Sequence, residues 1–254
     1  MFLHVVGARP NFMKVSPLMK EMGRNNIPQK LLHTGQHYDF LMSRVFFEEL
    51  DIPVPDYHLE ISIGKTHAEQ TGNIMIECEK VFESLKPKAI IVYGDINSTV
   101  SASLAAVKLH IPVIHIESGL RSFDRKMPEE INRMVVDTIS DYLFCIDSES
   151  VKNLKNEGIT KNVYLSGNLM IDTLKLLTLD NKSDDFILLT LHRPSNVDDK
   201  EKLFKTLKNI DELDEKVLFP VHPRIRKVID GMNFKNIKTS LPMSYKEFIN
   251  KLKQ

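Results

Sequence analysis

The chain of 254 residues is 42% hydrophobic and 27% charged, which is enough for one or two domains with a proper core. Its 34 basic and 34 acidic residues cancel, so we expect neither nucleic acid nor an anionic membrane as a partner. The apolar runs have the length of strands, which argues against a transmembrane helix. Cys78 and Cys145 stand alone without a C-x-x-C pattern, which predicts reduced core residues and a cytoplasmic protein.

Short runs rich in Val, Ile and Leu alternate along the chain with longer segments at helical spacing. We predict strands at Phe2–Val6, Lys30–Thr34, Ala89–Tyr93, Val113–Ile116, Tyr142–Ile146 and Val163–Leu165. We predict helices at Asn11–Met22, Asp39–Leu50, His67–Leu85, Ser98–Leu109, Glu129–Ser140 and Ser148–Glu157. This α/β alternation is typical of a parallel sheet covered on both faces, so residues 1–169 form a doubly wound, Rossmann-like domain.

A second alternation follows a helix predicted at Met170–Leu177 and a polar, breaker-rich linker at residues 178–185. It comprises strands at Phe186–Thr190 and Val217–Pro220, a short run near Ile237, and helices at Asp199–Ile210, Arg224–Asp230 and Tyr245–Lys253. We assign residues 170–254 to a second Rossmann-like domain. Its elements amount to about half of a typical doubly wound domain, so we expect this domain to be incomplete.

Polar residues follow the first three strands, where ligands bind in open parallel sheets. After the first strand, Arg9 and Lys14 flank a helix N-terminus, which fits an anion site or two solvated cations at an ordinary turn. After the second, HTGQHYD predicts a polar loop around Gln36 and His37 rather than a metal site. After the third, Asp95 stands at the strand tip, ahead of the N-cap candidates Asn97 and Ser98.

The segment HIESGLRSFDRKMPEEINR interleaves carboxylates with arginines. His115 and Glu117 share one face of a strand, and Glu129 and Glu130 begin a helix whose dipole favours at least one of them for structural reasons. The pattern suits recognition of a charged substrate with acid–base chemistry, although a surface network of salt bridges has the same composition. The charged residues in it are Glu117, Arg121, Asp124, Arg125, Glu129, Glu130 and Arg133.

Two histidines in the second half follow apolar strands, and an arginine lies one or two residues beyond each. His192 precedes Arg193 in TLHRPSN, and His222 stands two residues before Arg224 in PVHPR. A single such histidine is usually structural, but two of them indicate a second anion-binding wall.

Seven segments in this order resemble the non-hydrolysing UDP-N-acetylglucosamine 2-epimerases: VVGARPNFMKVSPL, HTGQHYD, YGDINSTVSASLAA, HIESGLRSFDRKMPEEINR, LSGNLMIDTL, TLHRPSN and PVHPR. The resemblance implies two Rossmann-like domains in the arrangement of GT-B glycosyltransferases, with the UDP-sugar between them. It also implies a cytosolic homodimer that needs no metal or redox cofactor. The implied activity interconverts UDP-GlcNAc and UDP-ManNAc for cell-surface polysaccharide synthesis, by elimination of UDP to a glycal and its re-addition.

The resemblance also implies roles for individual residues. Asp95, Glu117 and Glu129 are the carboxylates near the sugar, and His192 lies near the diphosphate. Arg9, Lys14 and Arg133 are their charge partners. Together with the candidates from the residue patterns, the predicted substrate-binding residues are Arg9, Lys14, Gln36, His37, Arg121, Arg133 and His222. Which carboxylate removes the proton from C2 stays open, because the pattern assigns neither face of the sugar to one side chain.

The family continues for about a hundred residues beyond the last residue of this chain. That part includes a Thr-Asp-Ser-Gly-Gly run and a Gln-Glu-Glu run, which nothing here matches. One alternative is therefore a truncated, catalytically silent remnant that keeps the dimerising first domain. Another, a GT-B glycosyltransferase, fits the fold but not the carboxylate-rich segment. A UDP-sugar with a second acetamido group or a uronate would need the same core residues.

Overall fold

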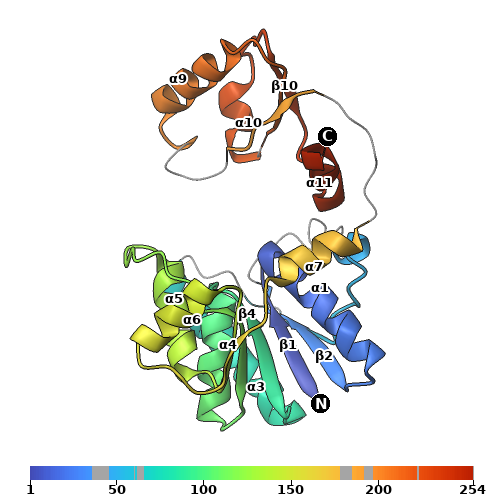
Figure 1. Cartoon of the computed structure of the whole chain (residues 1–254), viewed down its shortest axis with the longest axis vertical. Helices are drawn as coiled ribbons and strands as arrows, with labels where there is room; N and C mark the ends of the chain where they lie inside the picture. Colours follow the sequence, from blue (N-terminus) through green and yellow to red (C-terminus); the bar gives the residue numbers. More distant parts are fainter. Residues whose placement is uncertain are drawn as a thin grey trace. The chain divides into compact units, whose positions relative to one another are not determined.

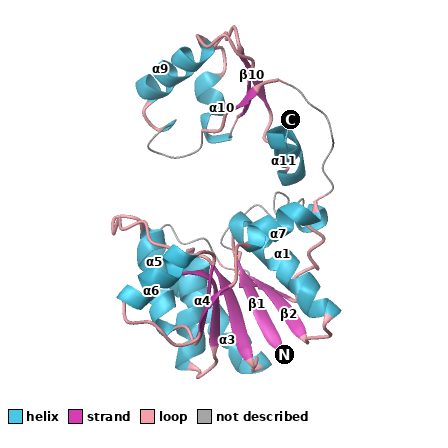
Figure 2. Ribbon diagram, in the orientation of Figure 1, coloured by secondary structure: helices cyan, strands magenta, loops and turns pink. Residues whose placement is uncertain are grey.

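The computed structural model describes residues 1–35, 46–59, 61, 66–177, 185–191, 197–221 and 223–253. The chain divides into two compact units, Met1–Leu177 and Thr178–Gln254. Each unit is an α/β structure with its own sheet, as Figures 1 and 2 show. Among the described residues, no helix has both the length and the apolar character that crossing a bilayer requires.

The first unit is built on a seven-stranded parallel sheet in the order β3-β2-β1-β4-β5-β6-β7. Its strands are β1 (Phe2–Val6), β2 (Gln29–His33), β3 (Tyr57–His58), β4 (Ala89–Tyr93), β5 (Val113–Ser118), β6 (Tyr142–Cys145) and β7 (Val163–Leu165). The expected doubly wound α/β fold is confirmed. The sequence pattern missed β3, because two residues that pair only with the end of β2 leave no apolar run.

Helices cover both faces of this sheet (Figure 2). They are α1 (Arg9–Arg24), α3 (His67–Leu85), α4 (Asn97–Lys108), α5 (Pro128–Ile139), α6 (Ser148–Asn156) and α7 (Leu169–Leu176). Helix α1 packs on β1, β2 and β4, whereas α4 packs on β1, β4 and β5 with α3 and α5 against it. The predicted helix Asp39–Leu50 lies mostly outside the described residues, although 46–49 are helical.

The central strands carry the core. Leu3, Ile90 and Val113, from three different strands, are fully buried with Phe82 of α3 and Ala106 of α4. Side chains buried on both faces explain why these strands appear as continuous apolar runs. The carboxyl ends of β1, β4 and β5 therefore lie side by side, and the loops that follow them meet at one edge of the sheet.

Helix α7 belongs to the first unit, whereas the sequence boundary between residues 169 and 170 assigned it to the second domain. It packs against α1, and the buried Thr173 hydroxyl donates a hydrogen bond to the Met13 carbonyl. Tertiary contact across 160 residues, which local patterns do not reveal, moves the division by one helix.

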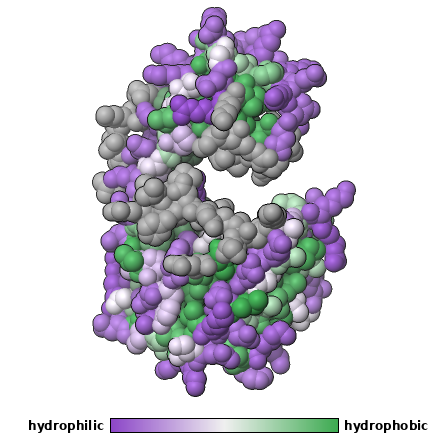
Figure 3. Space-filling model, turned by 180° about the vertical axis from the view of Figure 1, so that it is seen from behind, coloured by the Kyte–Doolittle hydropathy of each residue, from purple (hydrophilic) through white to green (hydrophobic). Residues whose placement is uncertain are grey.

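The second unit contains a three-stranded parallel sheet in the order β10-β9-β8. Its elements are β8 (Ile187–Leu188), α9 (Lys200–Asp211), β9 (Val217–Pro220), α10 (Pro223–Ile229), β10 (Ile237–Ser240) and α11 (Tyr245–Lys253). Leu203, Leu207, Val217 and Phe219 form the centre of its separate core. On the face seen in Figure 3, the coloured residues are mostly hydrophilic, with smaller hydrophobic patches.

Candidate active site

The loop between β1 and α1 is fixed to the end of β4 by one buried amide. The Asn11 side chain accepts a hydrogen bond from the Gly7 amide at 3.0 Å and donates one to the Tyr93 carbonyl at 3.0 Å. Gly7 has no space for a side chain, because a Cβ there would lie 2.8 Å from the Cβ of Ser98. This close approach sets the position of α1 and hence of Lys14 on its second turn.

Two cations and two carboxylates meet at the carboxyl ends of β4 and β5. Lys14 of α1 forms an ion pair with Glu117 of β5. Arg133 of α5 donates to the Asp95 carboxylate at 2.6 Å and to the Glu117 carboxylate at 3.2 Å, and it also contacts the Glu117 carbonyl. The Lys14 and Arg133 side chains are each 6% exposed, Glu117 is 14% exposed and Asp95 is 29% exposed. We call these four residues the ionic cluster.

Glu117 adopts a backbone conformation that is rare for its residue type. Its φ is +69°, and the register between β5 and β6 shifts from Ile116 to Ser118. A non-glycine residue in the left-handed region is uncommon and costs about 1–2 kcal/mol. Such strain persists where the surrounding structure imposes it, and it concentrates at functional sites. The bulge turns the Glu117 carboxylate towards Lys14 and Arg133 instead of leaving it in strand alternation.

The ionic cluster keeps Glu117 ionised. Burial alone raises the pKa of this carboxyl, but Lys14 and Arg133 lower it further than burial raises it, so the pKa lies below its ordinary value of 4.5. At neutral pH Glu117 is therefore a carboxylate, which can accept a proton and cannot donate one.

Amide side chains form hydrogen bonds next to the ionic cluster. Asn132 donates to the Asp95 carbonyl at 2.9 Å and to Asn97 at 3.1 Å, and Asn97 donates to Gln70 at 2.7 Å. The predicted N-cap roles of Asn97 and Ser98 are wrong, because Ile96 is the N-cap of α4 and no side chain caps the helix. Asn132 and Gln70 were not identified from the sequence. The one sequence feature that could have indicated Asn132 is its position directly before Arg133.

The structure brings together four of the predicted site residues in the ionic cluster. The four are Lys14, Asp95, Glu117 and Arg133. The Arg9 guanidinium lies 5.5 Å from the centroid of the Phe46 ring. Glu129 is exposed in the first turn of α5, four residues before Arg133, and such spacing puts both on one side of a helix. The predicted residues Gln36, His37, His192 and His222 lie outside the described residues.

Arg121, which the sequence predicts at the substrate, binds carboxylates of its own protein. Its side chain is 1% exposed and donates to Asp137 at 2.7 Å and to both carboxylate oxygens of Glu157 at 2.6 and 2.7 Å. Burial lowers the pKa of Arg121, but the two carboxylates raise it more, so it lies above its ordinary value. With its donors bound to the protein, the guanidinium holds the loop after β5.

The second of the two adjacent glutamates is also structural. Glu130 is buried and accepts hydrogen bonds from the Ser122 amide at 2.8 Å, the Ser122 hydroxyl at 2.9 Å and the Phe123 amide at 3.2 Å. It fastens the loop between β5 and α5, so Glu129 is the member of the pair that remains available at the surface.

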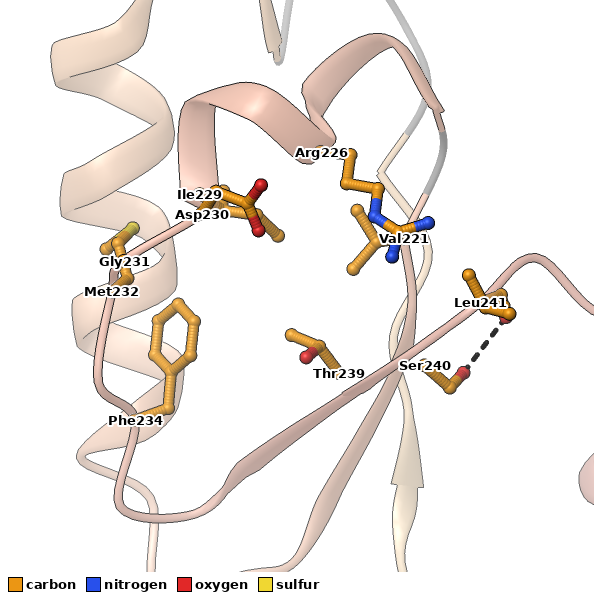
Figure 4. A pocket seen from close by; sticks show the side chains of 10 residues that line it. All are labelled: Val221, Arg226, Ile229, Asp230, Gly231, Met232, Phe234, Thr239, Ser240 and Leu241. Atoms are coloured by element: carbon orange, nitrogen blue, oxygen red, sulfur yellow. Dashed lines mark hydrogen bonds between the residues drawn. The ribbon is translucent and has the colours of Figure 1, made fainter.

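A pocket lies on the second unit between α10 and the end of β10 (Figure 4). Its lining combines the polar side chains of Arg226 and Thr239 with the apolar side chains of Val221 and Phe234. No predicted site residue that the structure describes lines this pocket. Within the described ranges, no group of three or more His, Cys, Asp or Glu side chains is placed to hold a metal ion.

The known proteins that this chain resembles are sugar-nucleotide epimerases. A family model described as UDP-N-acetylglucosamine 2-epimerase matches residues 20–254. A UDP-N-acetylglucosamine 2-epimerase homolog from Methanococcus maripaludis is 43% identical over 96% of this chain and 74% of the relative. A Pseudomonas aeruginosa UDP-2,3-diacetamido-2,3-dideoxy-D-glucuronate 2-epimerase is 42% identical over 97% of this chain and 74% of the relative.

A solved structure is equally similar. The crystal structure of Methanocaldococcus jannaschii UDP-GlcNAc 2-epimerase in complex with UDP-GlcNAc and UDP has a TM-score of 0.85 and 42% identity, covering 98% of this chain and 75% of that one. The chain belongs to the UDP-N-acetylglucosamine 2-epimerase family, whose members are isomerases. The family resemblance predicted from the sequence motifs is confirmed. The chain spans about three quarters of the length of these relatives.

Proposed function

We propose that this chain interconverts UDP-N-acetylglucosamine and UDP-N-acetylmannosamine. The observation that carries the proposal is the ionised Glu117, held in a strained conformation between Lys14 and Arg133. Its support from the comparisons is that a relative of 42% identity bears the name of this activity and was crystallised with UDP-GlcNAc and UDP. A role in the synthesis of cell-surface polysaccharides belongs to the same proposal.

The chemistry explains why carboxylates and cations must meet at one site. The hydrogen on C2 of the sugar is not beside a carbonyl, so its removal must be coupled to loss of a leaving group. A carboxylate takes the C2 proton, the C–H electrons form the C1–C2 double bond, and UDP leaves C1 with its bonding pair. A proton then returns to the other face of C2 while UDP oxygen attacks C1, so no atom is gained or lost.

The described residues fit the two halves of this reaction. Glu117 and Asp95 are carboxylates that can exchange protons with C2, and Arg133 orients both through its hydrogen bonds. Lys14 and Arg9 supply positive charge for the departing diphosphate. As the family resemblance implies, we include Glu129 and His192 in the site as further catalytic groups. We also include Gln36, His37 and His222, which follow predicted strands, as substrate-binding groups.

Deuterium incorporation tests the proposal. The protein is incubated with UDP-GlcNAc in heavy water, and NMR follows the hydrogen on C2 of both epimers. We expect both to carry deuterium at C2, and Glu117→Gln to slow the exchange by about 10²–10⁴-fold. Glu83→Gln, at an exposed glutamate of α3, is the matched control and should exchange at the rate of the unaltered protein. Epimers that retain the original hydrogen would refute the elimination.

A second substrate is favoured by one comparison. The Pseudomonas aeruginosa relative, named for a diacetamido glucuronate sugar, is as similar to this chain as the Methanocaldococcus jannaschii structure is. We therefore assay UDP-2,3-diacetamido-2,3-dideoxy-D-glucuronate in parallel. A kcat/KM for this sugar tenfold or more above that for UDP-GlcNAc would assign the chain to the second activity, about 1.4 kcal/mol of preference in the transition state.

We also propose that the chain forms a homodimer in the cytoplasm. One side of α5 presents a groove of apolar side chains, Ile131, Met134, Val135 and Ile139, of which Ile131 is 36% exposed. Burying this groove against a second copy would remove it from water. Ile131→Asp should convert the dimer to a monomer in sedimentation equilibrium, and a monomeric unaltered protein would contradict the dimer.

Cell fractionation tests the proposed location. Recovery of the protein in the membrane or secreted fraction of its cells would contradict a cytoplasmic location.

A further inference from the structure

His115 is fully buried on β5, and both nitrogens of its ring face hydrogen-bond acceptors. Nδ1 lies 2.8 Å from the Asp137 carboxylate, and Nε2 lies 2.8 Å from the Gly94 carbonyl. A carbonyl oxygen only accepts, and so does an ionised carboxylate. A ring with a proton on each nitrogen would donate to both oxygens, whereas a neutral ring would bring a lone pair against one of them.

Asp137 of α5 is the acceptor that makes this arrangement possible. Its side chain is fully buried, and its second oxygen accepts from the Gly119 amide at 3.1 Å and from Arg121 at 2.7 Å. Burial raises the pKa of Asp137, but His115 and Arg121 lower it further, so the pKa lies below its ordinary value of 3.8. Asp137 is therefore ionised and surrounded by donors.

These contacts enclose the strained residue of the ionic cluster. The ring of His115 and the amide of Gly119 stand two residues before and two residues after Glu117, and both bind the same carboxylate. The bulge at Glu117 thus has both ends fixed to Asp137. Asp137 is also one helical turn beyond Arg133, which binds the Glu117 side chain.

The other end of the His115 ring reaches the loop after β4. It donates to the Gly94 carbonyl, and the Gly94 amide in turn donates to the Ile116 carbonyl at 2.9 Å. Gly94 directly precedes Asp95, the second carboxylate of the cluster. One buried ring therefore connects the two strand ends that carry Asp95 and Glu117.

We propose that Asp137 and the doubly protonated His115 are positioning residues for the epimerase reaction, holding Glu117 in its left-handed conformation and fixing the loop of Asp95. Neither residue touches the sugar. The inference rests on the proposed function in one respect, that Glu117 acts at C2.

The test compares two variants that each remove one of the two carboxylates bound to Arg121, the buried Asp137 and the more exposed Glu157. Asp137→Asn releases His115 and Gly119 from a shared anion, whereas Glu157→Gln removes the other partner of Arg121 without touching either end of the bulge. We expect kcat of Asp137→Asn to fall about 10²-fold, as for a misplacement of about 1 Å, with KM changed by less than about twofold. Glu157→Gln should keep both constants. UDP titration by calorimetry counts the folded sites, so that a loss of folded protein is not taken for a loss of kcat.

Two structural measurements, a crystal structure and an NMR spectrum, also test the inference. In a crystal structure of Asp137→Asn we expect Glu117 to leave the left-handed region, and an unchanged bulge with unchanged kcat would overturn the proposal. If that variant does not fold, nitrogen-detected NMR of the unaltered protein decides: two protons on the His115 ring support the pair, and one proton overturns it. An unaltered protein without C2 exchange would refute the proposed function alone, and the variant structure and the NMR signal would still decide the positioning role.

Discussion

Gly94 offers a direct test of how tightly the ionic cluster is built. Its φ is +64°, and a Cβ added there would lie 3.2 Å from the Lys14 Nζ and 3.8 Å from a Glu117 carboxylate oxygen. Gly158 has a φ of +81° with no atom within 4 Å of a built Cβ. Alanine at either position meets the same kind of backbone strain, but only at Gly94 does it press on the cluster.

The two variants should therefore lose similar amounts of stability but differ in activity. Alanine in the left-handed region costs about 1–2 kcal/mol, partly offset by the lower entropy of the unfolded chain, so both variants should lose about 1 kcal/mol of unfolding free energy. At Gly94 the Lys14 ammonium must also move by a few tenths of an ångström. Since about 1 Å of misplacement costs about 10²-fold, we expect Gly94→Ala to lose about tenfold in kcat/KM.

Urea unfolding followed by circular dichroism measures the first effect, and initial rates with UDP-GlcNAc measure the second. Gly158→Ala is the matched control and should keep its kcat/KM. If Gly94→Ala retained full kcat/KM at the expected loss of stability, the contact between Lys14 and Glu117 would not control the reaction. An equal loss of activity in both variants would show that general destabilisation is responsible.

Three further predictions concern the framework of the first unit. Gly7→Ala should lose about 1–3 kcal/mol of unfolding free energy by urea titration, because its Cβ overlaps Ser98. Burial lowers the pKa of His4 from 6.5 to about 4. The contribution of His4 to stability is therefore complete above pH 6.5 and is lost as the pH falls towards 4. His4→Gln should remove up to about 1.4 kcal/mol per pH unit from the slope of the unfolding free energy against pH in that window. Thr66→Ala should cost about 1 kcal/mol in the same titration with kcat unchanged, because Thr66 caps α3.

The sequence predicted the elements whose cause is local. Six of the seven strands of the first unit follow from their apolar runs, and the start of α3 follows from a capping box in which Thr66 accepts from the Glu69 amide. Helix α1 begins at Arg9, two residues before the predicted start at Asn11, because Pro10 fits the first turn of a helix.

The features that the sequence did not predict arise from contacts between distant residues. Nothing near Glu117 indicates a positive φ, because the bulge depends on Asp137, twenty residues further along the chain. Arg121 has the residue type of an anion-binding group, yet Glu157 and Asp137 bury it. Composition alone does not distinguish an arginine that binds substrate from one that binds two carboxylates of its own protein.

The contact of α7 with α1 has a consequence for synthesis on the ribosome. The apolar residues Phe12 and Val15 of α1 leave the ribosome early, whereas Thr173, which bonds to Met13, is made 160 residues later. β1 also lies in the middle of the sheet, between β2 and β4. It cannot pair on both sides until β4, which begins at Ala89, has been synthesised. The nascent chain therefore carries an unfinished amino-terminal layer through most of its translation, when a chaperone has the longest time to bind it.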